Sequence, residues 1–205
     1  MSALSKKELE ILLEQCRGFE KPKAKLEQYV TPATIASDIL NFAYLRGDLE
    51  GKIIFDIGCG AGRLAIGASL MGAKDVTGFD VDCETLVLAG ENAKKLNAGV
   101  NWVCMDVSKI TGECDTVIQN PPFGAKKKGA DRPFLDAAIR VGKVIYSMHK
   151  SSTRDFIKDY IEQKGGKITD ISQVQFEIPH SYSFHKKRIK RIEVDIYRIE
   201  RRDEF

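Results

Sequence analysis

The residues whose types and spacing point to chemistry lie at positions 119–124, which read QNPPFG and follow the short apolar run DTVI. Proline has no backbone N–H, so Pro121 and Pro122 exclude a helix interior or a central strand at this point. Pro121 also pushes the preceding Asn120 toward extended geometry. The predicted result is a rigid strand end that presents the Asn120 amide, bare carbonyl oxygens and the ring of Phe123. An ordinary loop needs fewer constraints, so the motif predicts a binding site, and the rest of the chain must indicate what that site holds.

A glycine-rich loop lies upstream, in the segment DIGCGAGRL at positions 56–64. Glycines 58, 60 and 62 allow a tight turn and a close approach of the backbone to a ligand. Their G-x-G-x-G spacing is shorter than the G-x-G-x-x-G dinucleotide fingerprint and fits a ligand without a pyrophosphate. Asp80 ends the next expected strand, where it can accept hydrogen bonds from both hydroxyls of a ribose. A turn needed only for packing and a nicotinamide cofactor are the alternatives.

The pattern D-x-G-x-G-x-G resembles the first motif of S-adenosylmethionine-dependent methyltransferases. NPPF resembles the catalytic motif of those that methylate amine or amide nitrogen. The segments EQYVTP, NPPFG and YSFHKKRIKRIEVDIYRIE narrow the resemblance to the methyltransferase-like family that makes N6-methyladenine in small-subunit ribosomal RNA. The resemblance covers nearly the whole chain. It implies S-adenosyl-L-methionine as the cofactor, structured RNA as the substrate and a Rossmann-like class I methyltransferase fold.

The resemblance also implies which positions hold the cofactor. An N-terminal segment is expected to close over it, the glycine loop to line its methionine end, and later strand ends to flank its ribose and adenine. Close relatives differ at positions 61 and 63, in a loop where backbone contacts matter more than side chains. The implied positions are Gln28, Thr31, Asp56, Gly58, Gly60, Ala61, Arg63, Asp80, Val81, Asp106, Val107 and Asn120.

The implied catalytic residues are Asn120, Pro121, Pro122 and Phe123. The exocyclic amine of adenine is a poor nucleophile because its lone pair is delocalised into the ring. Two acceptors, the side-chain oxygen of Asn120 and the carbonyl of Pro121, would favour a pyramidal nitrogen whose lone pair points at the methyl group. Phe123 would stack on the base and hold its plane. The plain alternative is a strand that ends in proline, with a packed phenylalanine.

Two basic groups are candidates for contact with RNA phosphates. One follows the catalytic motif directly. The other precedes the last expected strand, and nearby Arg198 is expected to add to its positive charge. The alternative is that these charged residues only form a solvent-exposed surface, as clusters of like charge usually do. The candidate RNA-binding residues are Lys126, Lys127, Lys128, His185, Lys186, Lys187 and Arg188.

The bulk properties exclude several classes of protein. With 43% hydrophobic and 30% charged residues, the composition is that of a soluble globular protein, and the net charge of +3 says little about partners. Charges throughout the first twenty residues argue against a signal peptide, and no apolar run approaches a membrane span. The five cysteines form no CxxC, which argues against a disulfide framework and a zinc site and fits reduced thiols in the cytoplasm. His180 and His185 have no ligand cluster beside them, so no metal site is expected.

Two other functions stay open at this point. A protein-glutamine N5 methyltransferase would also use an NPP-aromatic motif, although tyrosine is usual there and those enzymes carry an extra N-terminal helical domain. A non-catalytic RNA-binding assembly factor could keep the fold, but the intact Asp56, Asp80, Asn120 and both prolines argue against it. The resemblance further implies a partner, a small zinc-binding activator protein that covers an apolar edge of the methyltransferase.

The elements that must position these residues alternate along the chain. Helices are expected at 4–16, 33–45, 61–72, 84–97, 133–141 and 152–166, and strands at 52–57, 75–82, 101–106, 115–119, 143–149, 167–178 and 191–200. Strands separated by helices imply right-handed crossovers and a mostly parallel α/β sheet of seven strands. The last two strands alternate with period two and are expected to form an antiparallel pair. The chain is expected to be one domain over 1–205, in which residues 1–45 form a helical segment that closes over the cofactor and residues 46–205 form the Rossmann-like core.

Overall fold

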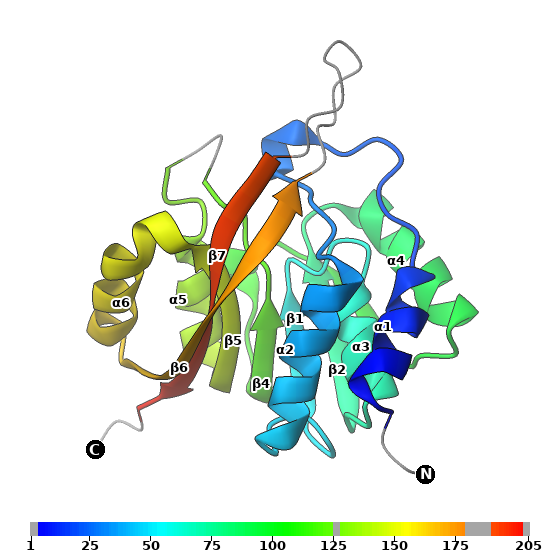
Figure 1. The fold of residues 1–205 in the computed structure, drawn as a ribbon, viewed down its shortest axis with the longest axis horizontal. Coiled ribbons are helices and arrows are strands. Elements are labelled where there is room, and N and C mark those ends of the chain that lie inside the picture. The colour runs from blue at the N-terminus through cyan, green and yellow to red at the C-terminus, as the bar shows by residue number, and fades with distance from the viewer. Residues whose placement is uncertain (1–3, 125–127, 179–189, 203–205) are drawn as a thin grey trace.

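One mixed sheet organises the molecule, and a computed structural model describes it over residues 4–124, 128–178 and 190–202. The strand order is β3-β2-β1-β4-β5-β7-β6 (Figure 1). The strands are β1 (Ile53–Ile57), β2 (Asp75–Asp80), β3 (Asn101–Cys104), β4 (Cys114–Gln119), β5 (Gly142–Lys150), β6 (Gly166–Ile178) and β7 (Lys190–Arg201).

The first five strands are parallel, and their order reverses between β1 and β4. In open α/β sheets, ligands bind beyond the carboxyl ends of the strands at such a reversal. The glycine loop follows β1 and the NPPF motif follows β4. The topology therefore brings the two motifs, which lie far apart in sequence, to the same edge of the sheet.

The C-terminal strands form the antiparallel pair that the sequence predicts. β7 pairs antiparallel with both β5 and β6, so it lies inside the sheet while β6 ends it. Positions 194–199 of β7 are all buried, because the strand contributes to both apolar cores, with Val194 and Ile196 in one and Tyr197 and Ile199 in the other. The predicted seven-stranded Rossmann-like architecture is thus confirmed.

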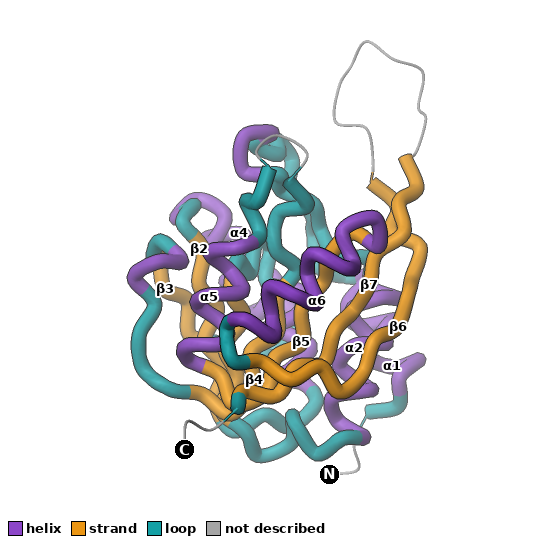
Figure 2. The backbone as a smooth tube through the Cα atoms, turned by 90° about the vertical axis from the view of Figure 1, so that its left-hand side faces the viewer, coloured by secondary structure: helices purple, strands orange, loops and turns teal. Residues whose placement is uncertain are grey.

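Helices cover both faces of the sheet. On one face lie α1 (Lys6–Glu14), α2 (Ala33–Leu45), α3 (Arg63–Leu70) and α4 (Cys83–Lys95), and on the other lie α5 (Arg132–Val141) and α6 (Arg154–Gln163) (Figure 2). Each group encloses its own apolar core against the strands. In the described parts of the chain, no helix is long and apolar enough to cross a bilayer.

The starts of α1 and α6 differ in their capping. Ser5 and Glu8 form the reciprocal capping box at the start of α1. Thr153 is the N-cap of α6, but its side chain makes no capping bond. Its hydroxyl donates to the carbonyl of Lys150 at 2.9 Å instead, because a short 3₁₀ turn precedes the helix.

The prediction of reduced thiols is wrong for two cysteines. Cys83, the first residue of α4, and Cys104, the last residue of β3, form a disulfide with their Cα atoms 5.2 Å apart. No local spacing marks this pair, since 21 positions separate the two residues. The parallel pairing of β2 with β3 brings them together, because α4 begins just after β2. Cys16, Cys59 and Cys114 are free and buried.

Arg198 does not extend the basic surface that the sequence suggests. Its side chain is buried, and its Nε donates to the Asp48 carboxylate at 2.8 Å. The hydroxyl of Tyr146, which faces Arg198 across β5 and β7, donates to the same carboxylate at 2.6 Å. Arg198 lies on the same face of the sheet as Val194 and Ile196, since side chains alternate along β7, and there the internal carboxylate of Asp48 compensates its charge.

Candidate active site

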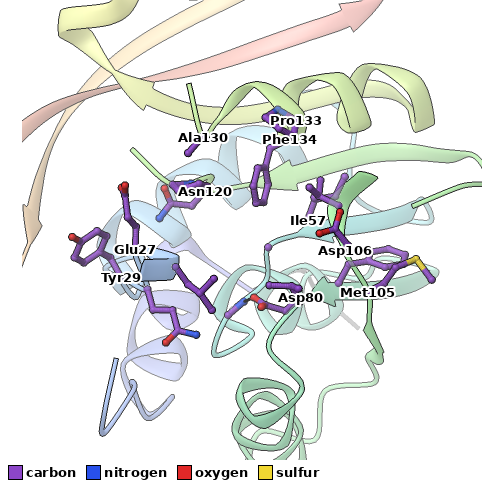
Figure 3. Close-up of a pocket in the computed structure, with 18 of the residues that line it drawn as sticks. Glu27, Tyr29, Ile57, Asp80, Met105, Asp106, Asn120, Ala130, Pro133 and Phe134 are labelled. Atoms are coloured by element: carbon purple, nitrogen blue, oxygen red, sulfur yellow. Dashed lines mark hydrogen bonds between the residues drawn. The ribbon is translucent and has the colours of Figure 1, made fainter. Parts of the chain in front are cut away.

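Both sequence motifs line one cavity of about 400 Å³ at the carboxyl edge of the sheet (Figure 3). A smaller pocket of about 30 Å³ adjoins it and shares Gly58, Gly60 and Asn120 with it. The cavity is lined by Gln28, Asp80, Val81, Asp106 and Val107 from the predicted set, and the smaller pocket by Thr31, Asp56, Ala61 and Arg63. Each of the twelve predicted cofactor positions therefore lines one of these two spaces.

The glycine loop forms the floor of the cavity. Gly58, Gly60 and Gly62 have φ angles of 74°, 52° and 84°. These values lie in the left-handed region, which residues with a Cβ atom rarely adopt. A Cβ atom at Gly58 would lie 2.8 Å from the ring of Phe134, and one at Gly60 would lie 3.1 Å from the ring of Phe19. Both glycines are needed for backbone conformation and for space.

Asp80 is held at the end of β2 with its carboxylate toward the cavity. Its two oxygens accept backbone hydrogen bonds, one from Asp82 and one from Gly60, each at 2.9 Å. Burial raises the pKa of this carboxyl group, although these hydrogen bonds oppose the shift. A carboxylate oxygen can accept more than one hydrogen bond, so both remain available to ligand hydroxyls.

The smaller pocket brings together a buried acid, Asp56, and a half-buried base, Arg63. Asp56 is 1% exposed, and one of its oxygens accepts from the backbone N–H of Ala65 at 2.9 Å. The other oxygen has no hydrogen-bond partner among the described residues, and burial raises the pKa of Asp56 to about 7. Arg63 donates to the carbonyls of Thr31 and Cys16, at 2.7 and 3.1 Å, while its Nε meets no partner within the described chain. This pair matches the ammonium and carboxylate groups at the amino-acid end of S-adenosylmethionine.

In the Asn120 side chain, the nitrogen makes a hydrogen bond and the oxygen has no partner among the described residues. Its Nδ2 donates to the hydroxyl oxygen of Thr31 at 3.0 Å. Its Oδ1 is buried and accepts no hydrogen bond from the residues that the structure describes. An unsatisfied buried acceptor costs free energy, so a ligand in the cavity that donates a hydrogen bond to this oxygen would remove that cost.

Phe123 differs from its neighbours in the motif. Asn120 and Pro122 line the main cavity, whereas Phe123 lines a second one of about 580 Å³. The Phe123 side chain is 8% exposed, and its ring meets that of Phe176 edge-on at 5.3 Å. The ring therefore belongs largely to the apolar core, and its stacking on a base stays a prediction.

The segment before α2 forms one wall of the main cavity. Lys23 forms an ion pair with Asp82 at 2.8 Å, and Gln28 donates to Asp82 and Thr85 at 2.8 and 3.1 Å. These bonds tie the segment to the loop between β2 and α4. The side chain of Gln28 is thus held beside the cavity by three hydrogen bonds, since its Oε1 also accepts from the backbone N–H of Lys23 at 2.8 Å.

Sequence reasoning missed the apolar lining of the cavity. Figure 3 shows the ring of Phe134 between Asn120 and Ile57. Such residues carry no local signal, since an apolar side chain that lines a cavity looks like any core residue in the sequence. The missed lining residues are Phe19, Leu26, Ile57, Phe79, Met105, Ile110, Pro133 and Phe134.

A buried polar chain behind the motif was also missed. Gln119 donates to the hydroxyl of Ser147 at 2.9 Å, Ser147 lies 2.8 Å from Nε2 of His149, and His149 Nδ1 lies 3.1 Å from Asp131. Burial acts to raise the pKa of Asp131, but the hydrogen bond and charge of His149 outweigh it and hold the pKa below its usual value. The order of groups resembles a hydrolase triad, but Ser147 is fully buried and His149 is 1% exposed, so no substrate reaches the serine. The chain instead joins the end of β4 to the segment before α5.

The predicted RNA-binding residues lie mostly beyond the described part of the chain. Lys128 is exposed and lines the second cavity. The other candidates, Lys126, Lys127, His185, Lys186, Lys187 and Arg188, lie outside the described residues, as does His180.

A comparison with known protein families agrees with this geometry. The profile named Methyltransferase small domain matches residues 35–141, a range that runs from α2 to the end of α5 and contains both motifs. The chain belongs to this methyltransferase family. The prediction of an S-adenosylmethionine-dependent methyltransferase is thereby confirmed, and the unused atoms of Asp56 and Arg63 fit that cofactor.

Several relatives match over nearly the whole chain. An uncharacterized protein of Methanocaldococcus jannaschii is 46% identical over 97% of this chain and 95% of its own. The rRNA N(6)-adenosine-methyltransferase METTL5 of Danio rerio is 40% identical over 94% of this chain and 97% of its own. The crystal structure of a Pyrococcus horikoshii protein, described as a candidate RNA methyltransferase, superimposes with a TM-score of 0.90 at 42% identity, covering 98% of this chain and all of that one.

Proposed function

We propose that this methyltransferase transfers a methyl group to N6 of adenine in structured RNA, and that the RNA is ribosomal, from the small subunit. The observation that carries the proposal is the buried Oδ1 of Asn120, an acceptor left without a partner among the described residues at the end of β4. The name of the Danio rerio relative, an rRNA N(6)-adenosine-methyltransferase, supports the same substrate class.

The geometry suits an amine nucleophile. S-adenosylmethionine supplies an activated methyl group, so the protein's task is alignment and electrostatic stabilisation. The Asn120 oxygen and the Pro121 carbonyl would accept hydrogen bonds from the two N–H bonds of the adenine amine. Positive charge develops on that nitrogen as it reacts, so both contacts strengthen in the transition state. Thr31 holds the amide of Asn120 by its other end, at 3.0 Å, and keeps the oxygen available.

The adenine must leave its stack to reach these acceptors, because enzymes that modify a base act on an extruded or unpaired nucleotide. Two cavities border the motif. The main cavity of about 400 Å³ is lined by Asn120 and Pro122, and the second cavity of about 580 Å³ is lined by Phe123. We propose that the cofactor takes the first space and that the RNA approaches from the second.

Nucleoside mass spectrometry tests the proposal. The protein is incubated with RNA and isotope-labelled cofactor, the RNA is digested, and labelled N6-methyladenine is the expected product. The matched control is Asn120→Ala, which should give no detectable label in the same time. Label found only in a glutamine side chain of a protein substrate would contradict the RNA proposal, as would label in RNA at a different atom.

We further propose two features that rest on family resemblance. The first is a small zinc-binding activator protein that covers an apolar edge of this chain, and the second is a cytoplasmic location. Purification of the chain with and without a coexpressed activator tests the partner. A soluble, monodisperse and fully active isolated chain would contradict the requirement for it.

A further inference from the structure

The second cavity has a wall that the proposed chemistry does not use. Phe123 of the catalytic motif borders it, and so do Arg132 from α5 together with Arg154 and Phe156 from α6. The two helices lie next to each other on the same face of the sheet (Figure 2). An RNA strand whose adenine reaches the motif would pass along this wall.

The wall contains a stack of planar groups. The Arg132 guanidinium carbon lies 4.6 Å from the centre of the Phe156 ring. The Phe156 ring is in turn stacked on that of Tyr160, with centroids 5.8 Å apart and an interplanar angle of 29°. Their spacing of four residues puts Phe156 and Tyr160 on the same side of α6, so part of this contact is ordinary helix stabilisation.

Packing alone does not account for Phe156. Its side chain is 44% exposed and lines the second cavity. Arg132, which covers one side of the ring, has an Nε that is buried and makes no hydrogen bond to any described residue. Exposed aromatic rings and guanidinium planes are the groups on which proteins stack unpaired RNA bases.

The charge of the cavity favours a polyanion. Four cationic side chains line it against two carboxylates: Lys128, Arg132, Lys150 and Arg154 against Asp131 and Asp155. Arg154 is held by Asp195 outside the cavity, in two bonds of 2.7 Å, and Asp131 is held by His149. Lys128 and Lys150 form no ion pair within the described chain, so both ammonium groups are available to phosphates.

We propose that Arg132 and Phe156 form a stacking platform for a nucleotide adjacent to the target adenine, with Lys128 and Lys150 contacting its phosphates. The proposal rests on the proposed RNA substrate and adds a binding subsite to it. The base on the platform would hold the strand in register while the adenine occupies the motif. Since every base has a flat face, the platform favours an unpaired nucleotide over a particular sequence.

An abasic scan separates stacking from packing. Binding of a short single-stranded RNA with one adenine is measured by fluorescence anisotropy, and each other base is removed in turn to leave its ribose and phosphate. With the parent protein, removal of one base next to the adenine should weaken binding by about 5- to 150-fold, the range expected for one stacked base. With Phe156→Ala, removal of that same base should cost little.

Two substitutions at the same position control for structure. Phe156→Leu keeps apolar volume but has no flat face, and should behave like Phe156→Ala, whereas Phe156→Tyr should retain the parent's sensitivity to the missing base. Phe156 lines neither the main cavity nor the smaller pocket, which are the spaces proposed for the cofactor. Cofactor affinity, measured by calorimetry, should therefore be unchanged in all three variants. Lys128→Ala should lower the salt dependence of binding and leave the abasic effect in place.

Equal abasic costs in the parent and in Phe156→Ala, at every position, would overturn the platform. A parent-like result for Phe156→Leu would likewise assign Phe156 to packing alone. Both outcomes are distinct from failure of the proposed function, which would show as absence of N6-methyladenine in RNA treated with the parent protein.

Discussion

Replacing Asn120 by alanine should separate the protein's activity from its stability. The side chain makes one hydrogen bond, from Nδ2 to Thr31, and leaves its buried Oδ1 without a partner among the described residues. The substitution therefore removes one satisfied group and one unsatisfied group together. Loss of the hydrogen bond to Thr31 lowers the free energy of unfolding, whereas removal of the unsatisfied oxygen raises it. For catalysis there is only a loss, because the oxygen that would accept from and align the adenine amine is gone.

The effect on the rate is the larger one. Loss of one preorganised polar contact to a developing charge costs about 10²–10³-fold in turnover. Because the contact strengthens only as the reaction proceeds, the loss should appear in the rate at saturation and leave RNA affinity nearly unchanged.

The effect on stability should be small. Losing the bond to Thr31 costs about 0.5–1.5 kcal/mol, whereas removing the unsatisfied oxygen relieves about 1–3 kcal/mol. The hydroxyl left on Thr31 offsets part of that relief. We expect the free energy of unfolding to change by about 1 kcal/mol or less in either direction, which moves the melting temperature by about 2–4 °C in a chain of this size.

Thr31→Val is the matched control, because it removes the same hydrogen bond from the other side. It keeps the Asn120 oxygen but leaves the Nδ2 group buried without its partner, at a cost of about 1–3 kcal/mol in stability. Single-turnover methylation at saturating cofactor and RNA, together with thermal unfolding, should show opposite patterns. Asn120→Ala should be slow and stable, and Thr31→Val less stable and faster than Asn120→Ala.

An Asn120→Ala protein that methylates RNA at the parent rate would show that Asn120 is not the acceptor for the reacting amine. An Asn120→Ala protein that loses several kcal/mol of stability would show that the amide serves mainly to hold the strand end. In either case the unsatisfied oxygen would need another explanation than an adenine amine.

Three further predictions concern cofactor and RNA binding. Asp80→Ala should weaken cofactor binding by about 2–4 kcal/mol through the loss of two charge-assisted hydrogen bonds, and unchanged affinity in calorimetry would contradict the ribose assignment. Because the pKa of Asp56 is raised to about 7 by burial, this group holds a proton below that pH and must lose it to pair with the ligand's ammonium. The binding free energy of the cofactor should therefore become more favourable by up to about 1.4 kcal/mol per pH unit between about pH 5.5 and 7, and then level off. Asp56→Asn should weaken cofactor binding and remove this dependence on pH. Neutralising Lys126–Lys128 together should weaken RNA binding and flatten its dependence on salt, with cofactor affinity unchanged; an equal slope in both proteins would return these lysines to a solvated face.

The burial of Phe123 changes how its role can be tested. The ring is 8% exposed and packs against Phe176, so Phe123→Ala would remove core volume and cost about 3–5 kcal/mol in stability. A loss of activity in that variant would report on folding as much as on base stacking. The structure thus limits an experiment that the motif alone suggests.

The sequence by itself determined the features that depend on local backbone chemistry. One such feature is the helix expected at 33–45, and α2 spans Ala33–Leu45. The glycines at 58, 60 and 62 predict a tight turn, and all three have positive φ. Proline and glycine restrict or widen φ and ψ wherever they occur, so the strand–loop–helix order and both motifs could be read without a partner in view.

Only the tertiary structure decided which side chains those motifs meet. Asn120 bonds to Thr31 across 89 positions, Arg198 pairs with Asp48 across 150, and Cys83 bonds to Cys104 because β2 and β3 are neighbours. The platform of Arg132 and Phe156 likewise needs α5 and α6 on one face of the sheet. Such pairs leave no local signal, since strand order, register and helix placement are set by burial of apolar surface over the whole chain.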